Sequence, residues 1–161
     1  METLVRHRDE GRANWFVNGL TIAKATSAET GGAYALSEHL VTAASNPPVH
    51  VHNDEEEAFY VLDGEIEIEV DGETTIARPG TFALSPRGSA HTFRVLTDTA
   101  RVLVINSSPG GAAGGFERFI EQAGTPAPAP VLPVPAAPDP VALTTIGAAC
   151  GIDILPPPEQ P

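Results

Sequence analysis

The 161-residue sequence predicts an all-β domain, a sandwich or a barrel, with a short helical extension at its C-terminal end. Residues 65–70 alternate strictly between glutamate and apolar side chains, as a strand with one buried face does. Asp-Gly dipeptides at 63–64 and 71–72 bracket this strand and favour tight hairpin turns. Turns rich in proline and glycine at 78–80 and 86–88 separate the next strands. Many short strands with regular turns are typical of a sandwich or barrel.

The strands expected on either side extend this pattern. Residues 15–22 and 34–41 read as two strands joined by a polar loop at 26–32. Residues 101–105 are almost continuously apolar, which is typical of a strand covered on both faces. Residues 15–106 show no long helical period, so we expect strands throughout this region.

The C-terminal part of the chain has a different pattern. Phe116, Phe119, Ile120 and Ala123 follow the i, i+3, i+4, i+7 spacing of a helix, and Gly124 is a suitable residue to end it. A segment with seven prolines follows, which predicts a semi-rigid, extended linker between Thr125 and Pro140.

A second helix is expected after this linker. Asp139 and Pro140 make a good N-cap and first helical residue, and we expect the helix to run to about Ala149 and to end at Gly151. Residues 152–155 are expected to form a last strand or a docking segment.

Composition excludes several classes of partner. Nine Lys and Arg against 21 Asp and Glu give a net charge of −12, which argues against nucleic-acid and anionic-membrane partners. Cys150 is the single cysteine and cannot form an internal disulfide. The first 16 residues lack an apolar signal-peptide core, and no stretch approaches the roughly 20 apolar residues of a spanning helix. We therefore expect a cytoplasmic protein without a membrane partner.

Four residues are candidate metal ligands: His50, His52, Glu57 and His91. His50 and His52 share one face of a strand, roughly 7 Å apart, so both imidazoles can converge on one ion. Glu57 follows a short acidic turn and can face the same ion from a neighbouring strand. This set suits one divalent transition metal ion, Fe, Ni, Mn, Co, Cu or Zn, without selecting among them. Four protein ligands leave positions open, which indicates a reactive site rather than a structural one.

The residues around these ligands resemble the two motifs of the cupin superfamily. The first motif, G-x5-H-x-H-x3,4-E-x6-G, is matched from His50 to Gly64, and the second, G-x5-P-x-G-x2-H-x3-N, is matched from Gly80 to His91. Ala44 stands at the opening glycine and Val95 at the closing asparagine, and neither position is a metal ligand in the family. The resemblance implies a conical barrel of the double-stranded β-helix type.

We accordingly divide the chain into two parts. Residues 1–109 are expected to form the cupin barrel with its N-terminal strands, with the metal site within residues 45–95. Residues 110–161 are expected to form a C-terminal extension with short helices and a Pro/Ala-rich linker.

Strand parity predicts the walls of a substrate pocket beside the metal. Phe59 and Val61 share the face of Glu57, and Phe93 shares the face of His91. Phe82 is expected to join them, as are Leu84, Ile66 and Ile68; for any one of these residues, barrel core without substrate contact is the stronger interpretation.

Other polar residues near the motifs are weaker candidates. Glu55 and Glu56 compete with Glu57 for the carboxylate role but are expected to lie in a solvated turn. His39 is expected to be exposed or hydrogen-bonded, and Arg87 to lie either near the pocket mouth or in a solvated loop.

Within the superfamily, the chain is similar to bacterial quercetin 2,3-dioxygenase-like single cupins, through residues 15–19, 57–62 and 114–127. The resemblance implies cleavage of a flavonol or similar hydroxylated ring with dioxygen, Glu57 being both ligand and general base, and it implies an aromatic small-molecule substrate and a homodimer. A redox-neutral metal-dependent cyclase or isomerase and a non-catalytic small-molecule-binding cupin remain the alternatives, because fold alone does not determine function.

Overall fold

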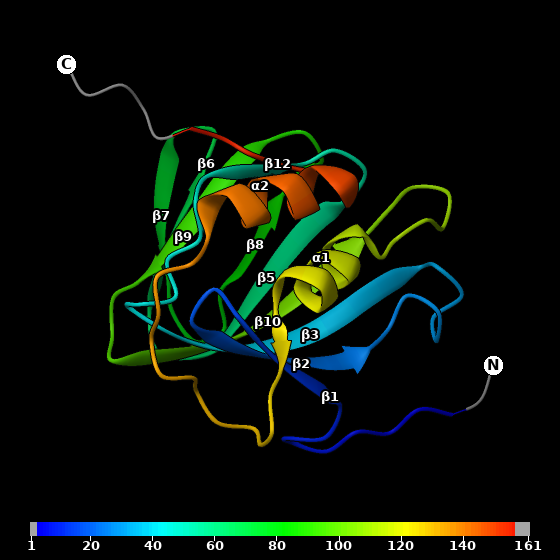
Figure 1. The fold of residues 1–161 in the computed structure, drawn as a ribbon, viewed down its shortest axis with the longest axis horizontal. Helices are drawn as coiled ribbons and strands as arrows, with labels where there is room; N and C mark the ends of the chain where they lie inside the picture. The colour runs from blue at the N-terminus through cyan, green and yellow to red at the C-terminus, as the bar shows by residue number, and fades with distance from the viewer. Residues whose placement is uncertain (1–2, 157–161) are drawn as a thin grey trace.

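The computed structural model describes residues 3–156 (Figure 1). Within them the chain forms the following strands and helices: β1 Arg12–Phe16, β2 Gly19–Ala25, β3 Tyr34–Thr42, β4 His50–His52, β5 Glu56–Asp63, β6 Ile66–Val70, β7 Glu73–Ala77, β8 Phe82–Ser85, β9 Ala90–Val95, β10 Thr99–Ser107, α1 Gly115–Ala123, β11 Thr125–Pro126, α2 Pro140–Ala149 and β12 Ile152–Ile154.

The strands form two antiparallel sheets that enclose a common core. The larger sheet has the order β11-β1-β2-β3-β10-β5-β8, and the smaller has the order β12-β4-β9-β6-β7. Phe59 and Val61 of the larger sheet belong to the same buried cluster as Ile66 and Ile68 of the smaller one. The expected all-β barrel with a short helical C-terminal part is therefore confirmed.

Two hairpins show how turn chemistry shapes the strands. Asp71 (φ 50°) and Gly72 (φ 82°) occupy the two central positions between β6 and β7, as the Asp-Gly dipeptide predicts for a type I′ turn. The single strand expected at residues 15–22 is wrong, because a turn at Val17 (φ 45°) and Asn18 (φ 58°) divides it into β1 and β2. A β-branched residue is a genuine outlier at positive φ, and the side chain of Val17 packs against the core.

The C-terminal helices form where their sequence signals predict. Phe116, Phe119 and Ile120 are the buried apolar residues of α1. The Asp139 carboxylate accepts hydrogen bonds from the backbone N–H groups of Val141 and Ala142, which caps α2. The two helices pack side by side on one side of the barrel (Figure 1).

Gly124 ends α1 for a different reason from the one expected. Its backbone is extended (φ −88°, ψ −178°) rather than left-handed. A Cβ at this position would lie 2.5 Å from the carbonyl oxygen of Ile120 and 2.7 Å from that of Trp15. Glycine therefore permits a close backbone approach between α1 and β1.

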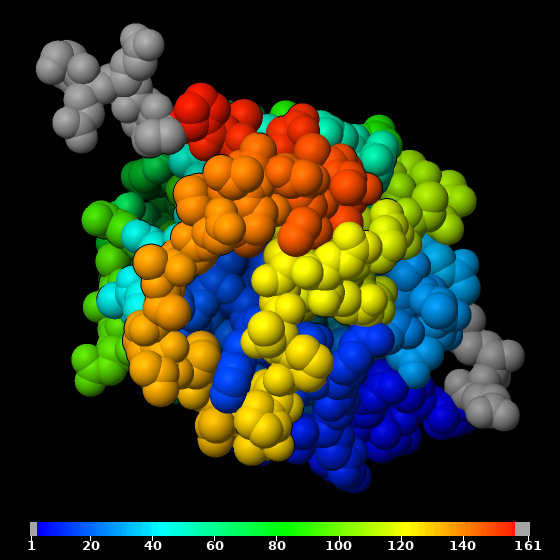
Figure 2. Space-filling model, viewed as in Figure 1, coloured from blue at the N-terminus to red at the C-terminus, as the bar shows by residue number. Residues whose placement is uncertain are grey.

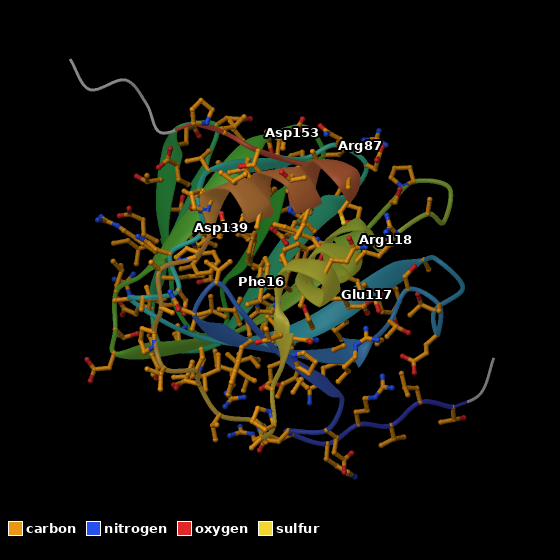
Figure 3. All side chains as sticks on the ribbon, viewed as in Figure 1. Phe16, Arg87, Glu117, Arg118, Asp139 and Asp153 are labelled. Atoms are coloured by element: carbon orange, nitrogen blue, oxygen red, sulfur yellow. The ribbon has the colours of Figure 1, made fainter. Side chains whose placement is uncertain are left out.

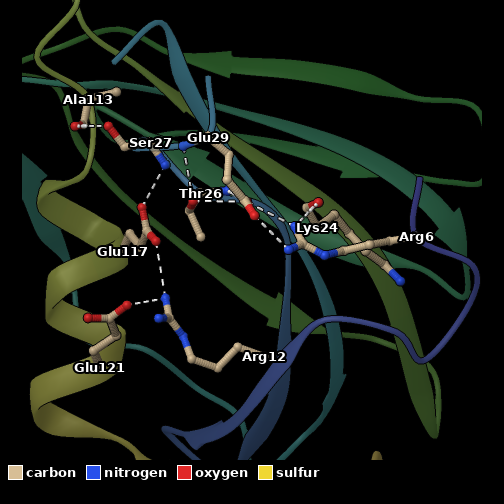
Figure 4. Close-up of polar contacts among 9 residues, drawn as sticks. All are labelled: Arg6, Arg12, Lys24, Thr26, Ser27, Glu29, Ala113, Glu117 and Glu121. Carbon is tan, nitrogen blue, oxygen red and sulfur yellow. Dashed lines mark hydrogen bonds and ion pairs between the residues drawn. The ribbon is translucent and has the colours of Figure 1, made fainter. Parts of the chain in front are cut away.

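Polar contacts attach α1 to the N-terminal strands (Figure 4). Glu117 accepts a hydrogen bond from the backbone N–H of Ser27 at 2.9 Å and pairs with Arg12 at 3.1 Å. Arg12 also pairs with Glu121, one turn further along the helix. These contacts hold the buried face of α1, which includes Phe116, against the open side of the larger sheet.

The C-terminal segment is built into the barrel rather than placed beside it. Strand β12 pairs with β4, with Ile152 opposite His52 and Ile154 opposite His50. Phe119, Leu143 and Ile152 belong to the barrel's own core cluster. The division at residues 109 and 110 stays a prediction, and its outermost parts, residues 1–2 and 157–161, lie outside the described residues. Among the described residues, no helix is both long and apolar enough to cross a membrane.

Candidate metal centre

Two neighbouring strands of the smaller sheet and one strand of the larger sheet bring the four candidate ligands together. His50 and His52 lie on β4, Glu57 on β5 and His91 on β9, where His91 is the cross-strand partner of His50. All four residues are buried, and one ligand atom from each lies within 4.8 Å of the others. Ligand distances of about 2.0–2.2 Å to a metal place opposite ligand atoms at most about 4.4 Å apart. A contraction of a few tenths of an ångström therefore suffices to coordinate one ion.

Backbone carbonyls orient two of the imidazoles. Nδ1 of His50 lies 2.9 Å from the carbonyl oxygen of Pro48, and Nδ1 of His91 lies 3.1 Å from that of Ser89. Each carbonyl precedes its histidine by two residues, so the segment that leads into each strand supplies the partner. A histidine whose Nδ1 donates to a carbonyl is left with Nε2 as the metal ligand.

The carboxylate is held from two sides. Oε2 of Glu57 lies 2.9 Å from Nε2 of His91, and Oε1 accepts a hydrogen bond of 3.2 Å from Nδ2 of Asn106. Asn106 is the partner of Glu57 across β5 and β10 and is itself buried. The amide therefore orients one carboxylate oxygen and leaves the other among the imidazoles.

His52 provides the test of whether these residues fit a metal ion. The side chain is 2 % exposed, and among the described residues neither ring nitrogen has a hydrogen-bond partner. An unpaired buried polar group is costly, about 1–3 kcal/mol. Nε2 lies 3.9 Å from Oε2 of Glu57, too far for a hydrogen bond but suitable for two ligands of one ion. The residues thus fit a divalent metal ion.

The protonation states also suit a metal site. Burial, reinforced by the neighbouring His91, lowers the pKa of His50 to about 3, and burial likewise lowers the pKa of His52. Burial works to raise the pKa of Glu57, but the surrounding imidazoles outweigh it and the pKa is lowered. Burial lowers the pKa of His91, but the hydrogen bond to Glu57 outweighs it, and the net shift is upward. Burial thus keeps His50 and His52 neutral, and the surrounding imidazoles keep Glu57 ionised, which are the forms that bind metals; His91, whose pKa is raised, would release its proton when an ion binds.

An apolar cavity of about 60 Å³ adjoins the cluster. His50, Glu57, Phe59 and Phe93 belong to its wall, and further lining residues come from the β1–β2 turn, the two helices and β12: Phe16, Val17, Phe116, Phe119, Leu143 and Ile154. We call the β1–β2 turn, α1, the linker 127–139 and α2 the cover. Figure 2 shows a hollow between the linker and α1, with residues of the N-terminal hairpin at its floor.

The expected pocket walls are only partly in place. Phe59 and Phe93 line the cavity, whereas Val61 is fully buried core that does not line it. The expectation for Phe82 is wrong, since its side chain is 59 % exposed. Across β5 and β8, Phe59 pairs with Ala83, so Ala83 faces inward and Phe82 faces solvent.

The prediction that Leu84 lines the pocket is wrong for the same reason. Leu84 lies on the same face of β8 as Phe82, and its side chain is also exposed. Arg87 is exposed in the turn before β9 and does not line the cavity. Figure 3 shows Arg87 at the edge of the molecule, well apart from Phe16 at the cavity. Of the two positions expected for Arg87, the structure therefore agrees with the solvated loop and not with the pocket mouth.

Glu55 does not lie in a solvated turn, as the sequence suggested. It is 3 % exposed, and its carboxylate accepts hydrogen bonds from the backbone N–H groups of Gly114, Gly115 and Phe116. A carboxylate at this position satisfies the free N–H groups at the start of α1 and complements its dipole. The acidic turn between β4 and β5 thus fastens the helix beside His52.

Sequence reasoning missed His39 and the aromatic residues of the cover. His39 is buried, lines the cavity and is hydrogen-bonded, so only the hydrogen-bonded alternative agrees with the structure. Phe116 was expected to be buried in its helix, but its contact with the ring of His52 (5.2 Å between centroids) depends on long-range packing. No local pattern signals such a contact.

Known proteins share the features described above. Residues 38–106 match the family described as Cupin domain. A segment of 56 residues, 35 % of the chain, is 38 % identical to quercetin 2,3-dioxygenase of Bacillus subtilis (strain 168) and spans only 17 % of that protein.

Solved structures show the same fold. KdgF from Halomonas sp. superposes with a TM-score of 0.59 at 16 % identity, covering 67 % of this chain and 94 % of that one. An RmlC-like cupin from Shewanella frigidimarina NCIMB 400 superposes with a TM-score of 0.58 at 14 % identity, covering 68 % and 94 %. Two sequence motifs, a barrel of two antiparallel sheets and a buried cluster of three histidines and one glutamate agree with these matches, and residues 38–106 of the chain form a cupin domain.

Proposed function

We propose that this protein is a metal-dependent cupin dioxygenase of the quercetinase type, acting on a flavonol or a similar hydroxylated aromatic ring. The observation that carries the proposal is the junction of a four-ligand cluster with an apolar cavity lined by Phe59, Phe93 and Phe116. Such walls suit a flat apolar molecule, and ligand pockets commonly combine apolar walls with few polar groups. The similarity to quercetin 2,3-dioxygenase supports the reaction class.

The site's own residues have distinct parts in this chemistry. His50, His52, Glu57 and His91 would hold the ion, which would lower the pKa of a substrate hydroxyl and, if redox-active, support reaction with dioxygen. Glu57 is ionised, lines the cavity and can accept the hydroxyl proton on Oε2. Nδ2 of Asn106 donates to Oε1 of Glu57 at 3.2 Å and holds that oxygen in place, which leaves Oε2 for the ion and the proton.

The size of the cavity restricts what enters without movement. An engineered cavity of about 150 Å³ is large enough for benzene, whereas this one is about 60 Å³. An aromatic substrate therefore requires part of the cover to move outward. Val17 and Leu143 are the cover residues best placed for this, because they come from a turn and a helix rather than from the barrel strands.

The same small volume favours a second candidate. A redox-neutral cyclase or isomerase that uses the ion only to polarise an oxygen atom of a smaller substrate would need less movement of the cover. In that case Glu57 would transfer a proton between substrate atoms, and dioxygen would not be consumed. A non-catalytic binding cupin, a homodimer and a cytoplasmic location stay predictions from the sequence.

Metal analysis followed by oxygen uptake tests the proposal. Protein purified without added metal or chelator is expected to hold close to one equivalent of a divalent metal, and the His50→Ala variant to lose it. His7→Ala, which alters an exposed histidine, is the matched control.

Quercetin is then supplied to protein loaded in turn with each candidate metal. Loss of quercetin matched by uptake of dioxygen supports the dioxygenase. Turnover of a small hydroxylated substrate under nitrogen supports the redox-neutral candidate instead. Binding without turnover of any substrate, with or without metal, would leave only the binding module.

A further inference from the structure

His39 is a buried titratable residue in the cavity wall that the proposed chemistry does not use. It lies on β3, is 6 % exposed and lines the same cavity as His50 and Glu57. It is no member of the four-ligand cluster. A polar ring in a wall that is otherwise mainly apolar needs an explanation, because burying it without a full set of partners is costly.

Two contacts hold the imidazole of His39 in place. Nε2 lies 2.8 Å from Oγ of Ser37 on the same face of β3. The ring stacks on Phe116, with 6.1 Å between centroids and an interplanar angle of 10°. Phe116 in turn lies 5.2 Å from the ring of His52, so one aromatic ring contacts both His39 and a metal ligand. The orientation of His39 is therefore fixed relative to the ligands.

One nitrogen of His39 is left for a ligand. Within residues 3–156, Nδ1 has no hydrogen-bond partner. The other polar side chains of the wall outside the metal cluster are already engaged. Oγ1 of Thr21 donates to the carbonyl oxygen of Asn14, and Oγ of Ser45 donates to that of Asn18 while accepting from the backbone N–H of Thr42.

We propose that His39 is a specificity-determining residue, which binds a second oxygen atom of the substrate at a part of the cavity wall outside the metal cluster. The proposal rests on the proposed function and adds a substrate class to it: a flat apolar molecule with one oxygen that reaches the metal and a second, distal hydroxyl or carbonyl oxygen that reaches His39. The apolar surfaces of Phe59, Phe93 and Phe116 would contact the body of such a molecule.

The chemistry of the imidazole explains this selectivity. Burial lowers the pKa of His39 to about 4, so the ring is neutral near pH 7 and Nδ1 either donates or accepts one hydrogen bond. The hydrogen bond with Ser37 selects the tautomer, and a hydroxyl group can serve either form. A ligand without the distal oxygen leaves a buried nitrogen unpaired, and sites built to pair with a polar group discriminate strongly against ligands that lack it.

Matched ligand pairs test the proposal by binding alone. The protein is loaded with Zn²⁺ and kept under nitrogen, and dissociation constants are measured for phenol against hydroquinone and for 3-hydroxyflavone against 3,4′-dihydroxyflavone. Each pair differs by one distal hydroxyl. The wild-type protein is expected to prefer the distal hydroxyl in at least one pair by about fivefold or more, as one hydrogen bond to a buried group provides. Equal affinity within both pairs, or no binding of any member, overturns the proposal.

Variants assign the preference to His39. His39→Phe keeps the stacking on Phe116. In this variant the ratio of the two dissociation constants within a pair is expected to be about one, and the affinity for the ligand without the distal hydroxyl is expected to stay within about twofold of wild type. His39→Gln, which keeps a hydrogen-bonding group, is expected to retain part of the preference and covers the case in which the Phe variant does not fold. Thr21→Val alters a neighbouring wall residue whose hydroxyl is engaged, and it is expected to leave the ratio unchanged.

A preference that survives in both His39 variants contradicts the assignment. As a readout independent of affinity, the ¹⁵N chemical shift of Nδ1 of His39 is expected to move with the dihydroxy member of a pair and not with its partner. Neither measurement involves turnover, so a failure of the oxygen-uptake experiment leaves the proposal for His39 testable. Likewise, equal affinities within the ligand pairs would not decide whether the protein consumes dioxygen.

Discussion

The metal end of the cavity and its cover are built from different kinds of structure. At the metal end, three strands present ligands whose orientation is set by carbonyl oxygens two residues earlier and by Asn106. The cover consists of a turn, two helices and a linker, and the linker is attached to the N-terminal hairpin by single hydrogen bonds such as that from Nε1 of Trp15 to the carbonyl oxygen of Val131 (2.7 Å). Strands hold the ligands of the first arrangement in place, and the proposed function requires part of the second to move outward when a substrate enters.

The largest expected effect comes from His52 at the metal end. His52→Leu removes a ligand and is expected to weaken metal binding more than about 1000-fold, because only three ligands remain. The same change removes two unpaired buried nitrogens, so the metal-free variant is expected to be as stable as the metal-free wild type or about 1 kcal/mol more stable. Metal titration and urea unfolding check the two parts. A variant that binds metal normally would exclude His52 from the site.

His39, where the two regions meet, is expected to make stability depend on pH. Its pKa is about 4 in the folded protein against about 6.5 when unfolded, so the unfolded state binds more protons between these values. Stability is therefore lost as the pH falls from about 6.5 to about 4, by on the order of 3 kcal/mol. The measurement is the difference in unfolding free energy between metal-free wild type and His39→Phe across this range. Parallel curves for the two proteins would contradict the neutral, buried state of His39.

Glu57→Gln tests the chemistry of the metal end without altering its shape. At saturating metal, activity is expected to fall by at least ~100-fold, because the proton acceptor is lost. The fold is expected to be retained, since an amide of equal size can still contact His91 and Asn106. Steady-state kinetics and a thermal unfolding curve provide the readouts. Full activity in this variant would reject Glu57 as the base.

The smallest expected effect lies in the cover. Asp139→Ala removes the N-cap of α2 and is expected to cost about 1 kcal/mol, seen first as faster hydrogen exchange of the α2 amides. Metal affinity is expected to stay within about twofold, because Asp139 lies outside the metal cluster. Asp153→Ala, on β12, is a control that leaves the cap in place. A large loss of metal affinity in Asp139→Ala would show that the two regions are coupled.

The two regions also differ in how well the sequence predicts them. The metal ligands were identified because a strand places alternate residues on one face and the two motifs carry the ligands at set spacings. The prediction for Phe82 was wrong because a four-residue strand has too few residues to show which side chains face inward. Only the pairing of β8 with β5 determines that face. His39 was missed because the opposite face of β3 carries Leu36 and Leu40 and is the more apolar one in sequence. Functional sites are where such local expectations fail.

By itself, the sequence determined the all-β class, the cupin motifs, the four candidate ligands, the two C-terminal helices and the hairpin at Asp71 and Gly72, because each depends on residues close together along the chain. The tertiary structure decided which strand faces line the cavity, how small the cavity is, and that Phe116 from α1 contacts both His39 and His52. It also decided that β12 pairs with β4, the strand that carries His50 and His52. These features bring together segments as distant as β3 and α2, and only the packing of the whole chain determines which of them meet.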